Sequence, residues 1–108
     1  MNQTILPITK FANDKGAIEY HINIDSAWDG LDSFVQYLQK YWQAEISESV
    51  DWVYSRRWVL RSNGVPISVY HDGQIGNYFV REDGSTDQTL LEKIEADLIR
   101  RFSDEPVF

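Results

Sequence analysis

The chain has 108 residues, which suits one domain with its own hydrophobic core. It contains no cysteine, so disulfides and thiolate zinc sites are excluded and a reducing compartment is compatible. Seventeen acidic residues against ten basic ones give a formal net charge of -7, which argues against direct nucleic-acid binding because phosphates would be repelled.

No segment reaches the roughly 20 apolar residues needed to cross a bilayer, and residues 1–10 lack the pattern of a signal peptide. We therefore expect a cytoplasmic protein without membrane contact. No repeat, linker or low-complexity segment interrupts the sequence, so residues 1–108 are expected to form a single domain.

Two strands are predicted at the start of the chain. Residues 5–11 and 17–24 are apolar-rich, and the turn-forming residues 13–16 separate them. Apolar and polar residues alternate through the second of these strands, which indicates one buried face. Pro7 lies within the first strand, and this position suits the edge of a sheet.

A helix is predicted to follow from Asp25-Ser26, where Ser26 and Asp29 have the spacing of a capping box. Gly30 is expected to weaken the first turn by about 1 kcal/mol relative to Ala, so the helix could begin later. Apolar residues then recur at helical spacing, and we expect this stripe to cover the sheet. The stripe consists of Leu31, Phe34, Val35, Leu38, Tyr41 and Trp42.

The next segment is less clearly patterned. Residues 44–50 are polar and acidic, and they are predicted to form a loop. Residues 51–55 are expected to extend the strand that follows, which would place Trp52 and Tyr54 on the same face as Trp58.

The segment 56–81 is predicted to form three consecutive antiparallel strands. Asn63-Gly64 and Asp72-Gly73 separate its apolar-rich runs, and both dipeptides favour tight hairpins. A two-residue loop at Asn63-Gly64 places most large apolar side chains of the first hairpin on one face. It pairs Ser62 with Val65, Leu60 with Ile67 and Trp58 with Val69.

The second hairpin cannot have an equally short loop, because the spacing between the two turns requires one extra residue in one of them. We expect a three-residue loop at 71–73 with Gly73 in the left-handed conformation. This register would pair Val69 with Ile75 and Val65 with Phe79.

A second helix is predicted after Ser85–Gln88, which is another capping-box candidate. Its apolar stripe consists of Leu91, Ile94, Leu98 and Phe102. Arg100 and Arg101 lie near its C-terminus, where the helix dipole favours cations. The predicted order is ββαβββα, an α+β fold in which an antiparallel sheet of about five strands carries two packed helices.

No pattern in the sequence indicates catalysis. His21 and His71 lack metal-ligand spacing, and they are expected on a polar strand face and at a turn. The serines do not form a G-x-S-x-G elbow, and the glycines do not form a phosphate-binding loop. The sequence therefore predicts a protein that is not an enzyme and has no metal site and no cofactor.

Three arginines interrupt the acidic background. Arg57 and Arg61 should share the sheet face opposite Trp58, with Arg56 next to them in the chain. They could bind a carboxylate or phosphate of a small ligand, with Tyr70 lining the same pocket. Alternatively, they pair with acidic side chains of the chain itself on a solvated face.

Acidic residues gather at the start of the first helix and again after its end, close to several aromatic residues. We predict a partner-binding surface made of Asp25, Asp29, Asp32, Glu45, Glu48, Asp51, Trp28, Trp52 and Tyr54. The length of the helix should keep the two acidic groups apart, as two patches along one edge. Alternatively, the aromatic residues belong to the core and the acidity serves solubility alone.

The segment RRWVLRSNGVPISVYHDGQIGNYFVRE, followed by an amphipathic helix, resembles the sheet and helix end of immunity proteins of contact-dependent inhibition and related polymorphic toxin systems. The resemblance covers about half of the chain and assigns a role to no particular residue. It implies a non-catalytic, cytoplasmic bacterial protein that binds and neutralises a cognate toxin protein, which we expect to be a basic nuclease. Two alternatives stay open, a homodimeric structural domain and a small-ligand-binding domain.

Overall fold

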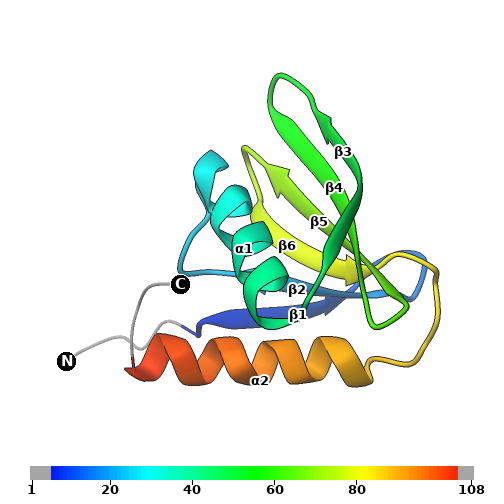
Figure 1. Ribbon diagram of the computed structural model, residues 1–108. Helices are drawn as coiled ribbons and strands as arrows, with labels where there is room; N and C mark the ends of the chain where they lie inside the picture. The colour runs from blue at the N-terminus through cyan, green and yellow to red at the C-terminus, as the bar shows by residue number, and fades with distance from the viewer. Residues whose placement is uncertain (1–5, 105–108) are drawn as a thin grey trace.

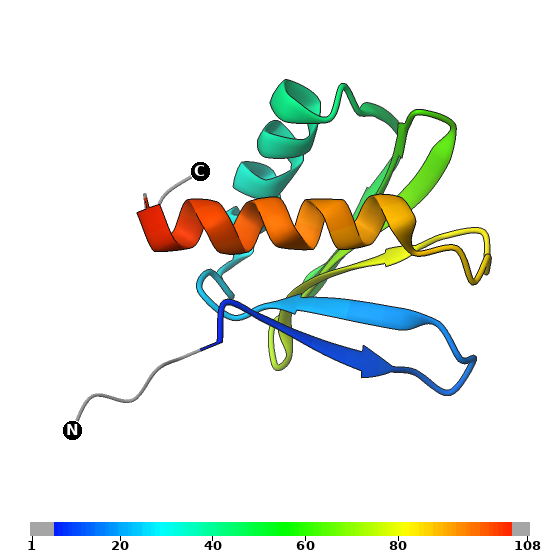
Figure 2. The same ribbon diagram turned by 90° about the horizontal axis from the view of Figure 1, so that it is seen from below.

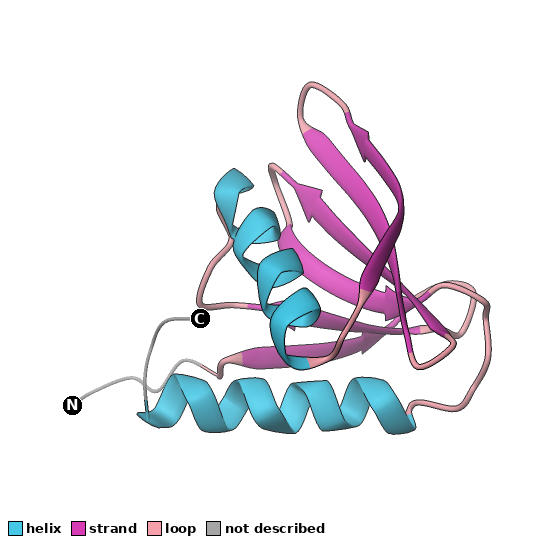
Figure 3. Ribbon diagram, viewed as in Figure 1, coloured by secondary structure: helices cyan, strands magenta, loops and turns pink. Residues whose placement is uncertain are grey.

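The computed structural model describes residues 6–104, which form a six-stranded antiparallel sheet and two helices (Figures 1 and 3). The elements are β1 (Ile8–Ala12), β2 (Ile18–Ile22), α1 (Trp28–Tyr41), β3 (Glu45–Asp51), β4 (Ser55–Ser62), β5 (Val65–Asp72), β6 (Gly76–Arg81) and α2 (Thr89–Asp104). The strand order in the sheet is β1-β2-β6-β5-β4-β3. The α+β class is confirmed, with one strand more than the five expected.

Both helices cover the same face of the curved sheet (Figures 1 and 2). α1 packs over β5 and β6. α2 lies along β1 and β2, where Lys10 Nζ is 3.4 Å from Glu95 Oε1 and the Tyr20 hydroxyl donates to Gln88 Oε1 at 2.9 Å. Neither helix has the length and apolar character required to span a membrane, within the described part of the chain.

The core lies between the helices and the sheet face that they cover. The predicted helix stripes supply much of it, since Leu31, Phe34 and Leu38 of α1 are fully buried together with the central apolar residues of α2. The strands add Tyr20, whose ring stacks on Phe79 at 4.8 Å between centroids. At the end of the α1 stripe, Tyr41 and Trp42 are only partly covered.

The first predicted hairpin is confirmed in full. Ser62 pairs with Val65, Leu60 with Ile67 and Trp58 with Val69. Asn63 and Gly64 have φ angles of 51° and 79°, the positive values that a two-residue turn of this kind requires. Local turn chemistry therefore sets this register.

The second hairpin has the expected extra residue, but the loop lies further along the chain than predicted. The loop consists of residues 73–75, since Asp72 pairs with Gly76, and Gly76 has the positive φ of 106° in place of Gly73. Val69 therefore pairs with Phe79. Because the register error is an even number of residues, each side chain keeps its predicted face of the sheet.

The loop predicted over residues 44–50 is wrong, because Glu45–Asp51 forms the edge strand β3. Its mostly polar side chains do not show the alternation of apolar and polar residues that usually indicates a strand. Its backbone nevertheless pairs with β4, with a bulge between Ile46 and Glu48. The predicted extension of β4 over residues 51–55 is also wrong. Residues 52–54 form the β3–β4 turn, where the Trp52 amide donates to the Ser55 carbonyl at 2.8 Å.

Both helices occur where predicted, but neither begins with the predicted capping box. The N-cap of α1 is Ala27, without a side-chain cap, and Asp25 Oδ1 instead accepts a bond from the Ala27 amide at 3.2 Å. At the start of α2, Asp87 Oδ1 accepts the Thr89 amide at 3.0 Å. At both helix starts an aspartate side chain accepts a bond from a backbone amide, in place of the capping boxes predicted from Ser26 and Ser85.

Candidate partner-binding site

Three connections of the fold lie at one end of the sheet, toward the left and upper left of the view in Figure 1. They are the β2–α1 connection, the β3–β4 turn and the β5–β6 turn. The two turns are joined by the Gly73 amide, which donates to the Tyr54 carbonyl at 3.0 Å. The β2–α1 connection is held by Asn77 Nδ2, which donates to the carbonyls of Asp25 and Ala27 at 2.8 and 3.0 Å.

Large apolar side chains are exposed on these three connections and at the start of α1. In the β3–β4 turn, Trp52, Val53 and Tyr54 are 53%, 79% and 81% exposed. The other exposed members are Ile24, Trp28 and Ile75. A cluster of exposed apolar side chains with aromatic members is typical of a protein-binding surface.

Five aspartates surround these apolar side chains: Asp25, Asp29, Asp32, Asp51 and Asp72. Apart from the buried His71, Arg56 is the only basic residue at this end in the described part of the chain. We call the six apolar residues and the five aspartates together the acidic-aromatic end.

Arg56 lies beneath this surface and is only 4% exposed. Its Nη1 and Nη2 donate to the two carboxylate oxygens of Asp32 at 2.7 and 2.9 Å, and its Nε donates to Asp51 Oδ1 at 2.9 Å. Nη1 also donates to the Trp28 carbonyl at 3.0 Å. The guanidinium lies over the rings of Trp28 and Trp58, at 4.8 and 5.3 Å from their centroids. One side chain thus joins α1, β3 and β4.

The expected separation of the two acidic groups is therefore wrong, because Asp32 of α1 and Asp51 of β3 bind the same guanidinium. Hydrogen bonds from Arg56 hold the pKa of both carboxyls below its usual range, against the effect of burial. The bond to Asp32 is the main cause that raises the pKa of Arg56. The cluster of two carboxylates and one guanidinium therefore keeps a net negative charge at neutral pH.

His71 is a buried residue that contacts Trp28 of this cluster. It was expected at a turn, but it lies within β5 and is 5% exposed. Its Nδ1 is 2.7 Å from Asn77 Oδ1, and since Asn77 Nδ2 donates to two carbonyls, His71 Nδ1 must carry the proton of this bond. The imidazole meets the Trp28 ring edge-on at 5.4 Å. His71 thus packs against Trp28 at the start of α1.

The acidic-aromatic end includes seven of the nine residues predicted to bind a partner. The exceptions are Glu45, at the opposite end of β3, and Glu48, which binds Arg57 Nη1 at 3.1 Å on the face without helices. The prediction omitted Arg56, because residues 51–55 were expected to be a strand and not the turn across which Arg56 pairs with Asp51. It also omitted the exposed Val53 and Ile75, because the extents of the two turns were misplaced.

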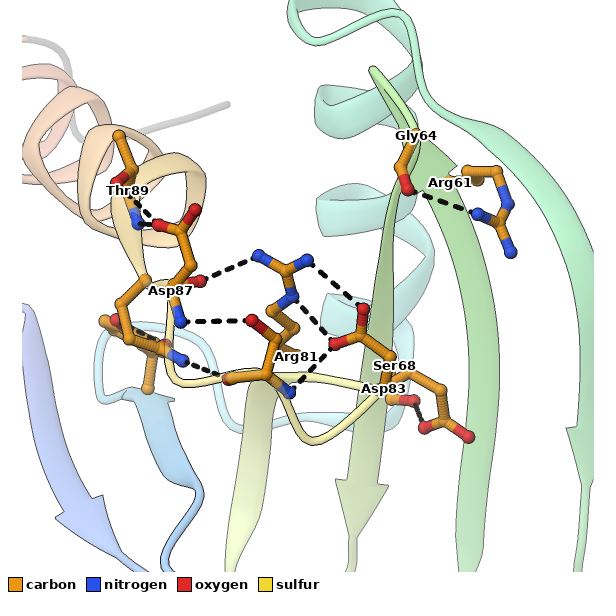
Figure 4. Close-up of polar contacts among 11 residues, drawn as sticks. Arg61, Gly64, Ser68, Arg81, Asp83, Asp87 and Thr89 are labelled. Carbon is orange, nitrogen blue, oxygen red and sulfur yellow. Dashed lines mark hydrogen bonds and ion pairs between the residues drawn. The ribbon is translucent and has the colours of Figure 1, made fainter.

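On the face without helices, Arg57 pairs with acidic residues of the chain, one of the two alternatives considered. It binds Glu48 and Glu82, and its Nε donates to the Tyr70 hydroxyl at 3.1 Å. Arg61 does not join this group, because its Nη1 donates to the Gly64 carbonyl at 3.2 Å (Figure 4).

A groove of about 770 Å³ opens beside Arg57 and Tyr70 and extends to the β1–β2 turn. Arg81 also lines it, and its guanidinium binds Asp83 Oδ1 at 2.7 Å and the Asp87 carbonyl at 2.8 Å (Figure 4). Its two arginines are thus already matched by acceptors of the chain. Binding of a small ligand, the alternative raised by the sequence, stays a prediction for this groove.

A row of rings crosses the same face and was not foreseen. Phe11 meets His21 edge-on at 5.0 Å, His21 stacks on Tyr78 at 4.6 Å, and Tyr78 stacks on Tyr70 at 5.0 Å. Burial is the main cause that raises the pKa of Tyr78 to about 12. The row depends on β2 lying beside β6, a long-range pairing that the sequence pattern did not specify.

We compared the protein with known protein families, curated proteins and solved structures, and no match was found.

Proposed function

We propose that the protein is a non-catalytic immunity protein that binds and neutralises a cognate toxin domain, expected to be a basic nuclease, through the acidic-aromatic end. The observation that carries this proposal is the meeting of six exposed apolar side chains with five aspartates at one end of the sheet, on three connections and on the ends of the elements that they join. The limited resemblance of the sequence to immunity proteins adds support.

The two kinds of side chain would act at different stages of binding. Trp and Tyr supply most of the binding free energy in many interfaces, because they bury a large area at a low cost in conformational entropy. The carboxylates would attract a basic surface, raising the association rate and selecting against acidic proteins. Together they favour a partner that is basic and has an apolar contact area.

The charge of this end argues against the homodimer alternative at the same surface. In a two-fold symmetric contact the same patch would face itself, so five aspartates would oppose five others. Among residues 6–104, this end has one arginine to offset them, and it is buried and already bound to Asp32. Sedimentation at micromolar concentration should therefore show a monomer, and a dimer lost on changing Trp52 and Tyr54 to Ala would contradict this.

The proposal is tested by capture from lysates of toxin-bearing strains, followed by purification of the captured partner and an assay of its nuclease activity. We expect one basic partner whose affinity falls with rising salt and whose activity the protein inhibits. Trp52→Ala with Tyr54→Ala should weaken binding at least tenfold, whereas Phe11→Ala, a matched control whose side chain is also 53% exposed, should not. A partner bound equally well by both variants, or one insensitive to salt, would count against the proposal.

A further inference from the structure

We infer that the tip of the β3–β4 hairpin, Trp52–Tyr54, enters the nucleic-acid-binding cleft of the toxin and occupies the place of its substrate. This inference rests on the proposed function, and it specifies which surface of the toxin the protein binds. It therefore predicts inhibition by direct competition with nucleic acid, as opposed to binding at a distant surface.

The shape of the hairpin suits insertion. The β3–β4 turn projects beyond the neighbouring connections in Figure 1, and Val53 and Tyr54 are the most exposed large apolar side chains in the described part of the chain. A projecting tip cannot bury three such side chains against a flat surface as fully as it can within a concave one. The tip therefore favours a partner with a cleft.

The hairpin is held in one conformation before any partner binds. The bond from the Trp52 amide to the Ser55 carbonyl closes the turn, and the bond from the Gly73 amide fixes Tyr54 to the next turn. At the base of the tip, Asp51 Oδ1 accepts bonds from Arg56 Nε at 2.9 Å and from Trp58 Nε1 at 2.8 Å. The hairpin therefore loses little conformational entropy when it binds, and this favours a high affinity.

The chemistry of the tip reproduces two features of a nucleic acid. Exposed aromatic rings can occupy positions where bases stack, since sites for single-stranded nucleic acids combine stacking surfaces with a cationic groove. Asp51 lies at the base of the tip and shares Arg56 with Asp32 of α1, so these two carboxylates and one guanidinium keep a net negative charge that favours the cations that otherwise bind phosphate. A concave, cationic and partly apolar cleft is thus the kind of surface that complements the shape of the hairpin tip and the charge beside it.

The inference is tested with a photo-crosslinking residue at the tip and the partner purified as described above. Val53→p-benzoylphenylalanine places the probe at a side chain that is 79% exposed, and Phe11→p-benzoylphenylalanine is the control near the opposite end of the fold. We expect the probe at position 53 to label partner residues lining the nucleic-acid cleft, identified by mass spectrometry. Excess single-stranded oligonucleotide should lower this yield at least fivefold, while the control position gives no label.

The possible outcomes separate the two proposals. If the partner binds the wild-type protein in a salt-sensitive way but the label lies outside the cleft, or the oligonucleotide does not compete, the inference is overturned and the proposed function stands. If no basic partner binds the wild-type protein, both are overturned. Circular dichroism and urea unfolding of the position-53 variant must match the wild-type protein, since the exposed tip contributes little to the core.

Discussion

At the scale of single residues, Arg56 determines the geometry of the acidic-aromatic end. It combines a bidentate bond to Asp32 with a bond to Asp51, so it fixes the start of α1 against the end of β3. A lysine could supply the charge but not the planar fork that reaches both carboxylates. Arg56 therefore acts as a positioning residue for the proposed site, and its effect should be measurable as stability.

Arg56→Ala is expected to lower the free energy of unfolding by about 3 kcal/mol, the lower part of the range for breaking a buried ion pair, because Asp32 and Asp51 are partly exposed and can be rehydrated. Arg56→Lys should show an intermediate loss. Urea unfolding at pH 7 measures both. Arg61→Ala is the control, since this exposed side chain has a single bond to a backbone carbonyl, and its effect should stay within about 0.5 kcal/mol. Equal stability of the two Ala variants would contradict the role of Arg56.

Asp97 joins the two helices through another network. It accepts a bond from the Tyr37 hydroxyl at 2.5 Å and from Arg101 Nε at 2.7 Å, and Trp42 Nε1 donates to the Tyr37 hydroxyl at 2.8 Å. Burial alone would raise the pKa of Asp97, but the hydrogen bonds from Tyr37, Arg101 and Arg100 outweigh it and lower the pKa to about 2. The folded protein therefore favours the ionised carboxylate.

Asp97→Asn should change how stability depends on pH. Since the pKa of Asp97 in the folded protein lies below its ordinary value of 3.8, its stabilisation is fully present above about pH 5 and is lost as the pH falls toward 2. We expect Asp97→Asn to cost about 2 kcal/mol at pH 7 and progressively less in acid. Urea unfolding from pH 7 to pH 2.5 measures this convergence. Asp14→Asn, at an exposed turn, is the control, and its effect at pH 7 should stay within about 0.5 kcal/mol.

At the scale of elements, the close approach of α1 to the sheet depends on Gly30 in its first turn. A Cβ atom at this position would lie 2.5 Å from Asn77 Nδ2 and 2.6 Å from Asp25 Cγ. The sequence suggested that Gly30 would only weaken the helix. The structure shows that it also makes room for Asn77, which binds the carbonyls before α1 and positions His71.

Gly30→Ala is therefore expected to destabilise the protein, although Ala is the better helix former by about 1 kcal/mol. Crowding against Asn77 should cost about 1–3 kcal/mol, as overpacking usually does. The free energy of unfolding in urea measures the balance. Gln36→Ala, an exposed position of α1, should leave it within about 0.5 kcal/mol. A stabilising Gly30→Ala would show that Asn77 can move away without loss.

The elements that could be predicted are those whose local pattern and tertiary role agree. The β4–β5 hairpin has both an Asn-Gly turn and an apolar face, so its register follows from the sequence. β3 has neither, because it is an edge strand whose acidic side chains face solvent and whose backbone pairs with β4. Its existence depends on a neighbour that the local pattern does not show.

The sequence predicted which residues belong to the candidate site more accurately than it predicted where they lie in the fold. Trp28, Trp52 and Tyr54 could be named because aromatic residues beside acids are unusual for a small core. That they lie at the same end of the sheet depends on the strand order β2-β6-β5-β4-β3, which places the β2–α1 connection beside the β5–β6 and β3–β4 turns. The buried position of Arg56 could not be foreseen, because a long charged side chain is ordinarily solvated.

At the scale of the whole molecule, charge is distributed unevenly. The acidic-aromatic end has five aspartates and one buried arginine, whereas Lys15, Arg61 and Arg81 lie toward the opposite end of the sheet, among further acids. A basic partner approaching in solution would therefore be oriented toward the acidic-aromatic end before contact. Such orientation affects the association rate more than the dissociation rate.

The position of a charge should consequently matter more than the net charge. Asp29→Lys and Asp14→Lys change the net charge equally, at exposed sites in the first turn of α1 and in the β1–β2 turn. We expect Asp29→Lys to lower the association rate with the basic partner several-fold and Asp14→Lys to have a smaller effect. Stopped-flow measurements should show this difference shrinking as ionic strength rises from about 0.01 M to 1 M, where the Debye length falls from about 30 Å to about 3 Å. Equal effects at low salt would mean that the partner docks elsewhere on the molecule.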